Sequence, residues 1–146
     1  MTDKRLTLVT GASRGIGRAL CVELATKHNH HVIAVARSQK ALEALDDEIK
    51  AAGGQVTLVP LDLTDANAIE RLSVAVLERW KKLDGLVGNA GVLGPLGPLQ
   101  TITPSGFNST IDVNLTANWP RSLHYVRGRA TSSRVLGGLS GIESRS

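Results

Sequence analysis

The sequence predicts an α/β protein, built on a doubly wound, Rossmann-type parallel sheet in a three-layer α/β/α arrangement. Two observations predict it. Short apolar runs alternate with segments whose apolar residues recur at helical spacing, as in repeated βαβ units. In addition, a glycine-rich stretch, Thr10–Gly17, joins the first predicted strand to the first predicted helix. Because the alternation stops near residue 119, we expect the sheet to be incomplete in its C-terminal half.

Each predicted element rests on a local pattern. The strands are apolar runs, the second one rich in β-branched residues, at 6–9, 31–36, 56–61 and 86–89. Three helices are indicated by apolar stripes at Ile16, Leu20 and Leu24; at Leu42, Leu45 and Ile49; and at Ile69, Leu72, Val76 and Trp80. Asp65 is placed to cap the third helix, and a fourth helix is predicted over residues 105–115.

The glycine-rich stretch has the properties of a phosphate-binding turn. A turn that leads from a strand into a helix presents backbone N–H groups and the positive end of the helix dipole to an anion. Gly11 allows the tight turn, Gly15 allows close approach of a ligand, and Gly17 allows the helix to pack against the sheet. The alternative is an ordinary glycine turn at the start of a helix.

Composition sets further bounds. The 146 residues are 42% hydrophobic, which fits one folded domain with a core, and no apolar run approaches the roughly 20 residues of a membrane span. The chain leads directly into its first strand, so we expect no secretory segment and no membrane partner. The single cysteine, Cys21, is expected to fill the core, and a cytoplasmic location follows as the default.

The net charge of +4 comes from the end of the chain. Residues 1–119 contain equal numbers of acidic and basic residues, and the excess lies in residues 120–146. Pro120 interrupts a helical pattern there, and the apolar residues that follow keep neither period. We therefore predict a domain over 1–119 and a poorly ordered tail over 120–146. The arginine-rich tail lacks interleaved aromatic residues, which argues against a nucleic-acid partner.

Together the motifs resemble those of the short-chain dehydrogenase/reductase family. The resemblance covers residues 5 to about 119 and is carried by Thr10–Gly17, Asp62-Leu63, Asn89-Ala90-Gly91 and Asn114. In an open parallel sheet these positions meet at the carboxyl ends of the strands. Family members commonly carry a second Asn where this chain has Gly88, a small departure.

The resemblance implies a role for each matching residue. The cofactor phosphates would lie against Gly11, Ser13, Gly15, Ile16 and Gly17, and the adenine against Asp62 and the Leu63 backbone. Asn89, Ala90 and Gly91 would lie under the adenosine ribose, and Asn114 would support a proton-relay water. Taken without the family, Asp62 is equally a turn or capping residue, and Asn114 a polar helix residue bonded to backbone.

The end of the second strand predicts NADP rather than NAD. An acidic residue there would bind the ribose 2′-hydroxyl of NAD, and many methyltransferases also need one. This chain has Arg37 and Ser38 instead, with Arg14 inside the glycine turn. A guanidinium suits the 2′-phosphate of NADP. The alternative is a pair of solvated arginines.

The family's catalytic Ser and Tyr-x-x-x-Lys have no convincing equivalent. Tyr125 and Arg129 have the right spacing, but the pair follows Asn114 closely, has no fifth strand before it, and carries Arg for Lys. His28, His30 and His31 suggest a metal site, but no Cys or acid pattern accompanies them, so solvated turn histidines are favoured. We expect no metal.

The sequence thus predicts an NADP-dependent oxidoreductase that transfers hydride between nicotinamide and a small carbonyl or alcohol substrate. The alternative is a catalytically inactive NADP-binding fragment. A frameshift or early stop near residue 120 would account for the change of pattern there, as would a sequencing artefact. Such a chain would expose its fourth strand, Leu86–Asn89, as a sheet edge, so we also expect self-association or a homo-oligomer.

Overall fold

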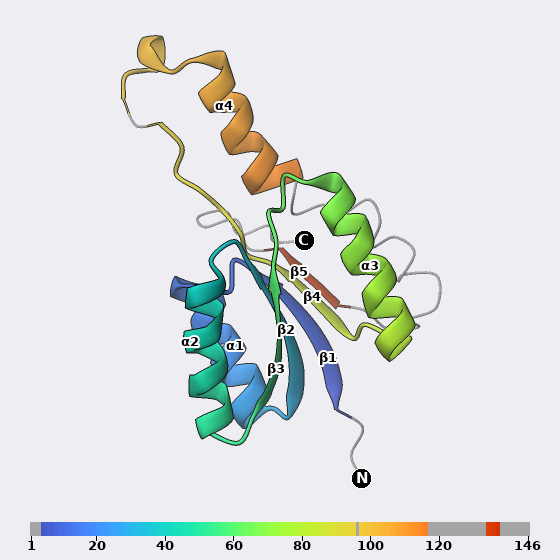
Figure 1. The fold of residues 1–146 in the computed structure, drawn as a ribbon. Coiled ribbons are helices and arrows are strands. Elements are labelled where there is room, and N and C mark those ends of the chain that lie inside the picture. Colours follow the sequence, from blue (N-terminus) through green and yellow to red (C-terminus); the bar gives the residue numbers. More distant parts are fainter. Residues whose placement is uncertain (1–3, 96, 117–133, 138–146) are drawn as a thin grey trace.

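The computed structural model describes residues 4–95, 97–116 and 134–137. A twisted sheet forms the middle layer, with α1 and α2 on one face and α3 on the other (Figure 1). The helix α4 lies beyond the carboxyl ends of the strands. The α/β class and the three-layer arrangement predicted from the sequence are therefore confirmed.

The sheet is parallel in every pairing between its strands. Its strands are β1 (Arg5–Thr10), β2 (His30–Ala36), β3 (Gln55–Pro60), β4 (Gly85–Gly88) and β5 (Arg134–Gly137), in the spatial order β3-β2-β1-β4-β5. Leu8 of β1 pairs with Ile33 of β2 on one side and Leu86 of β4 on the other. The strand order reverses between β1 and β4, which is where open α/β sheets bind ligands.

The helices begin where the sequence patterns place them. They are α1 (Gly15–Lys27), α2 (Gln39–Ala51), α3 (Ala66–Trp80) and α4 (Pro104–Ile111), with a 3-10 turn η1 (Leu99–Thr101) and a π-helical turn η2 (Asp112–Thr116). Ser38, Asp65 and Thr103 cap α2, α3 and α4 through hydrogen bonds from backbone N–H groups of the first turn.

Strand alternation divides the core between the two faces of the sheet. Val32 and Ala34 of β2 pack with Cys21, Leu42 and Ile49 beneath α1 and α2. The intervening residues of β2, Ile33 and Val35, point to the opposite face, where they join a second cluster that includes Leu6, Leu8, Val76 and Leu83. Both faces of β2 are buried, which explains its continuous apolar sequence.

The structure corrects the prediction that the fourth strand is an edge. Residues Arg134–Gly137 form β5, which pairs in parallel with Gly85–Gly88 of β4. Val135 and Leu136 pair in register with Leu86 and Val87, so this apolar dipeptide continues the sheet although it keeps no longer periodic pattern. A fifth strand therefore exists within the predicted tail, and it follows Tyr125 in the chain. The rest of that tail lies outside the described residues.

Within the part of the chain that the structure describes, no helix is long and apolar enough to cross a membrane.

Candidate functional site

The glycine turn after β1 has the backbone conformation that its glycines were predicted to provide. Gly11 has a φ of +66° and Gly15 a φ of +57°, in the left-handed region that other residues rarely adopt. The Ala12 N–H donates to the Val35 carbonyl at 3.1 Å, which fastens the turn to β2. The turn is thus held between the ends of two neighbouring strands.

Gly17 is where the turn, α1 and the segment after β4 come closest together. A Cβ at Gly17 would overlap the Gly11 carbonyl oxygen and Asn89 Nδ2. Asn89 Nδ2 in turn donates a hydrogen bond to that same carbonyl oxygen at 3.3 Å. At Gly11, a Cβ would lie 2.9 Å from the Ala90 Cα. The structure therefore brings together four predicted site residues, Gly11, Gly17, Asn89 and Ala90.

Thr10 holds these segments in register, a role that the sequence analysis did not assign. Its hydroxyl accepts hydrogen bonds from the N–H groups of Asn89 at 3.0 Å and Ala90 at 3.1 Å. The same hydroxyl donates to the Val87 carbonyl at 3.4 Å. Thr10 ends β1, and its partners are Val87 within β4 and the two residues that follow that strand. The only sequence signal was its place at the start of the glycine stretch.

The first turn of α1 lacks the side-chain cap that the other described α-helices have. Its N-cap is Arg14, in an extended conformation (φ −156°), and this side chain makes no capping hydrogen bond. Ile16 in the first turn is 74% exposed, and Ser13 is partly exposed beside it. The N–H groups of this turn are therefore available to donate hydrogen bonds to an anion.

Two exposed arginines flank this turn and the end of β2. Arg14 lies in the glycine turn, and Arg37 directly follows β2. Among the described residues, neither guanidinium forms an ion pair. The neighbouring Ser38 caps α2 by accepting a hydrogen bond from the Ala41 N–H at 3.3 Å. The Ser38 oxygen thus already has a structural partner, whereas both arginines remain exposed cations.

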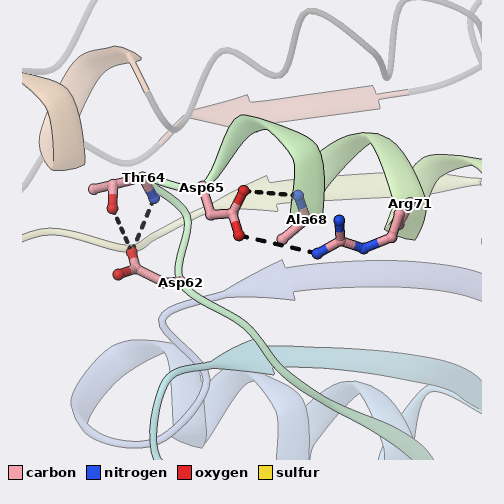
Figure 2. Close-up of polar contacts among 5 residues, drawn as sticks. All are labelled: Asp62, Thr64, Asp65, Ala68 and Arg71. Carbon is pink, nitrogen blue, oxygen red and sulfur yellow. Dashed lines mark hydrogen bonds and ion pairs between the residues drawn. The ribbon is translucent and has the colours of Figure 1, made fainter.

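Asp62 forms a tight turn after β3. Figure 2 shows its Oδ1 accepting two hydrogen bonds, from the Thr64 N–H at 2.9 Å and the Thr64 hydroxyl at 2.8 Å. The backbone bond first, and then the hydroxyl bond, lower the pKa of Asp62, with a smaller contribution from the charge of Arg37. The turn interpretation of Asp62 is therefore confirmed. Leu63 packs against the core beneath α3, which fixes the backbone beside Asp62.

Asn114 fastens the loop after β4. Its Oδ1 accepts from the Val92 N–H at 2.6 Å, and its Nδ2 donates to the Val92 carbonyl at 2.8 Å. Gly91 leaves room for this contact, since a Cβ there would lie 3.1 Å from Asn114 Oδ1. The side chain thus pairs with backbone, as its non-family interpretation expected, and it joins η2 to the segment that carries Asn89, Ala90 and Gly91.

Of the three histidines, His28 lies exposed just after α1, as the solvated-turn interpretation expected, whereas His30 and His31 lie in a strand. The strand predicted from residue 31 begins one residue earlier, at His30, and the rings of His30 and His31 contact the hydroxyls of Thr7 and Thr57, each at 2.8 Å. No group of His, Cys, Asp or Glu side chains suited to a metal ion occurs within the described ranges. The buried Cys21 is core as predicted, and burial raises its pKa to about 12. Tyr125 and Arg129 lie outside the described residues.

Comparison with known proteins gives a consistent result. The family model described as short chain dehydrogenase matches residues 5–122. A sepiapterin reductase of Chlorobaculum tepidum is 35% identical over 118 residues, and an NADPH-dependent pterin aldehyde reductase of Arabidopsis thaliana is 33% identical over 111 residues. A solved metagenomic short-chain oxidoreductase in complex with NADP superposes with a TM-score of 0.86 at 34% identity.

The matches cover most of this chain but only part of the relatives. They take in 77% of this chain and 48% of the Chlorobaculum reductase, and 76% and 45% for the Arabidopsis protein. For the metagenomic structure the shares are 97% of this chain and 65% of the other. The chain therefore spans about half the length of these curated relatives.

Proposed function

Because the chain belongs to the short-chain dehydrogenase family, whose members are oxidoreductases, we propose that the crevice at the ends of β1, β2 and β4 binds NADP(H). The observation that carries this proposal is the contact between Gly17, the Gly11 carbonyl and Asn89, which leaves no room for a side chain. It brings the backbone of the turn against the ends of the strands, where a pyrophosphate needs close approach.

The residues present fit a dinucleotide. The uncapped first turn of α1 and the left-handed Gly15 offer backbone donors for the pyrophosphate. On the same turn Ser13 is partly exposed and Ile16 is exposed, and Asp62 with the Leu63 backbone would hold the adenine. Asn89, Ala90 and Gly91 would lie beneath the ribose, and Thr10 and Asn114 hold that segment in place.

Arg14 and Arg37 favour NADP over NAD. Both are exposed and without an ion-pair partner among the described residues, so a 2′-phosphate would meet them without first breaking a salt bridge. A charge-assisted hydrogen bond contributes about 1.5–3 kcal/mol, which corresponds to about ten- to a hundredfold in affinity. Two relatives whose names or structures include NADPH or NADP support the same choice.

Arg37→Ala tests the choice of cofactor. Titration with NADPH and with NADH should show that the variant loses about ten- to a hundredfold in NADPH affinity and little in NADH affinity. Lys27→Ala removes one positive charge at the other end of α1 and serves as the matched control, with NADPH affinity near that of the unsubstituted chain. Unchanged NADPH binding in Arg37→Ala would overturn the assignment.

The bound nicotinamide would supply hydride transfer to or from a small carbonyl or alcohol substrate. Within this chain, Asn114 would hold the loop after β4 and support a proton-relay water near the reacting atoms. We therefore propose catalytic turnover of a small carbonyl or alcohol substrate together with binding of NADP(H).

A second candidate function is NADP binding without turnover. The chain has one tyrosine, Tyr125. The residue four positions after it is Arg129, whereas the family's tyrosine is followed at that spacing by lysine. Tyr125 also precedes β5 in the chain. Assaying NADPH oxidation with simple ketones and aldehydes, in parallel with the binding titration, separates the two candidates. Oxidation of NADPH above the background rate supports the oxidoreductase function, whereas saturable NADPH binding without oxidation supports NADP binding without turnover.

A further inference from the structure

A cluster of ring and cationic side chains lies at the amino ends of the strands, away from the proposed cofactor crevice. His31 at the start of β2 bonds through Nε2 to the Thr57 hydroxyl of β3 at 2.8 Å. The His31 ring also faces Trp80, the last residue of α3, with 5.5 Å between ring centroids and planes inclined at 59°. The guanidinium carbon of Arg79 lies 4.7 Å from the centre of the Trp80 ring. Trp80 thus contacts one permanent cation and one titratable group.

We propose that this contact between α3 and the sheet responds to pH, because protonation of His31 displaces the Arg79 guanidinium from the Trp80 indole. An indole attracts a cation through its quadrupole, so Arg79 is favoured there while His31 is neutral. When His31 gains a proton, two like charges meet at one ring and repel each other. The imidazolium keeps its place because Thr57 holds its ring, whereas Arg79 is exposed and free to turn into solvent.

The groups around His31 favour its neutral form. Burial is the main cause that lowers the pKa of His31 below its usual range. A hydrogen bond with Gln55 of β3 acts in the opposite direction, while the charges of Arg79 on α3 and Lys4 before β1 lower the pKa further. The contact should therefore hold Arg79 at neutral pH and release it on acidification. Lys81, with φ +59°, directly follows Trp80. Arg79 is therefore released from the indole at the C-terminal end of α3.

Trp80 fluorescence provides the test. The chain has two tryptophans, so a Trp119→Phe background leaves Trp80 as the reporter. Titration from about pH 8 to about pH 4.5 should show a transition with a midpoint below the ordinary histidine pKa of about 6.5. His31→Gln should abolish the transition and His30→Gln should preserve it. Arg79→Gln removes the like charge and should move the midpoint to higher pH, whereas Arg71→Gln, on the same helix, should leave it in place.

Two outcomes would overturn the proposal: a transition that persists in His31→Gln, or a midpoint that Arg79→Gln does not move. NMR titration of the His31 ring in the otherwise unsubstituted chain, with and without Arg79→Gln, gives the same comparison without the fluorescence background. An upward shift of the His31 pKa in Arg79→Gln supports the proposal, and an unchanged pKa overturns it. Circular dichroism at neutral pH confirms that each variant compared is folded.

Discussion

At the scale of single residues, Gly17 and Thr10 shape the proposed cofactor site in different ways. Gly17 acts by leaving space, because any Cβ would overlap the Gly11 carbonyl and the Asn89 amide. Thr10 acts by hydrogen bonding, because its hydroxyl accepts two N–H groups from the segment after β4. Sequence reasoning identified Gly17 from its spacing in the motif. It did not identify the Thr10 contacts, because they join residues 79 and 80 positions apart.

Replacing Gly17 should destabilise the fold as well as the crevice. Gly17→Ala introduces an overpacked methyl group against backbone, which costs about 1–3 kcal/mol of unfolding free energy. Gly53→Ala is the control, because Gly53 has a φ of +78° but open space around it, so this variant carries backbone strain without the clash. Urea unfolding measures both. If NADPH binds Gly17→Ala as well as it binds Gly53→Ala, the proposed role of this contact is wrong.

Thr10→Val should cost stability because it keeps the shape and removes the acceptor. The part-buried N–H groups of Asn89 and Ala90 would each lose the hydroxyl as acceptor, and the loss of such hydrogen bonds costs about 1–3 kcal/mol. Thr10→Ser retains the hydroxyl and should lose much less in urea unfolding. A loss in Thr10→Val no larger than that in Thr10→Ser would contradict the prediction, because the hydroxyl would then contribute no more than the methyl group that serine lacks.

At the scale of elements, sequence and structure agree where the pattern is local. The apolar runs located β1 to β4, and Asp65 was identified as the cap of α3 from its position before an amphipathic stripe. β5 was missed because four residues in an arginine-, serine- and glycine-rich stretch carry no periodicity. Val135 and Leu136 join the sheet by pairing with Leu86 and Val87 of β4, which lie far from them in the sequence.

Asp65 should contribute measurably to α3. Its Oδ1 accepts from the Ala68 N–H at 3.0 Å, and Arg71 lies 3.9 Å from its other oxygen (Figure 2). Asp65→Ala removes the cap and should cost about 1 kcal/mol, whereas Asp65→Asn keeps a capping oxygen and should cost less. Chemical denaturation of the three chains gives the comparison. A loss in Asp65→Asn equal to that in Asp65→Ala would assign the effect to charge instead of capping.

At the scale of the whole molecule, the parallel sheet brings the turn after β1, the start of α1 and the segment after β4 into contact. Gly11, Gly17, Asn89 and Ala90 meet because β1 and β4 are neighbours, an arrangement that the family resemblance anticipated. At the other end of the sheet, the sequence did not predict that the rings of His30 and His31 contact hydroxyls of the adjacent strands. Their solvated-turn interpretation failed because it considered only neighbours in sequence.

These two histidines should make stability depend on pH. Burial is the main cause that lowers both pKa values from 6.5, so the unfolded chain binds protons more readily than the folded one. The unfolding free energy should therefore fall as pH drops below 6.5, and the fall should end below the folded-state pKa values. The depressed pKa of Asp62 acts separately, below 3.8. Urea unfolding of a His30→Gln/His31→Gln variant should show a flatter profile; an identical slope would contradict this linkage.

Calorimetric titration of the unsubstituted chain with NADPH and with NADH tests the proposed binding of NADP(H) at the ends of β1, β2 and β4. We expect a single saturable site that binds NADPH about ten- to a hundredfold more tightly than NADH, because Arg14 and Arg37 would meet the 2′-phosphate. Equal affinity for the two cofactors, or no binding of NADPH by the folded chain, would contradict it.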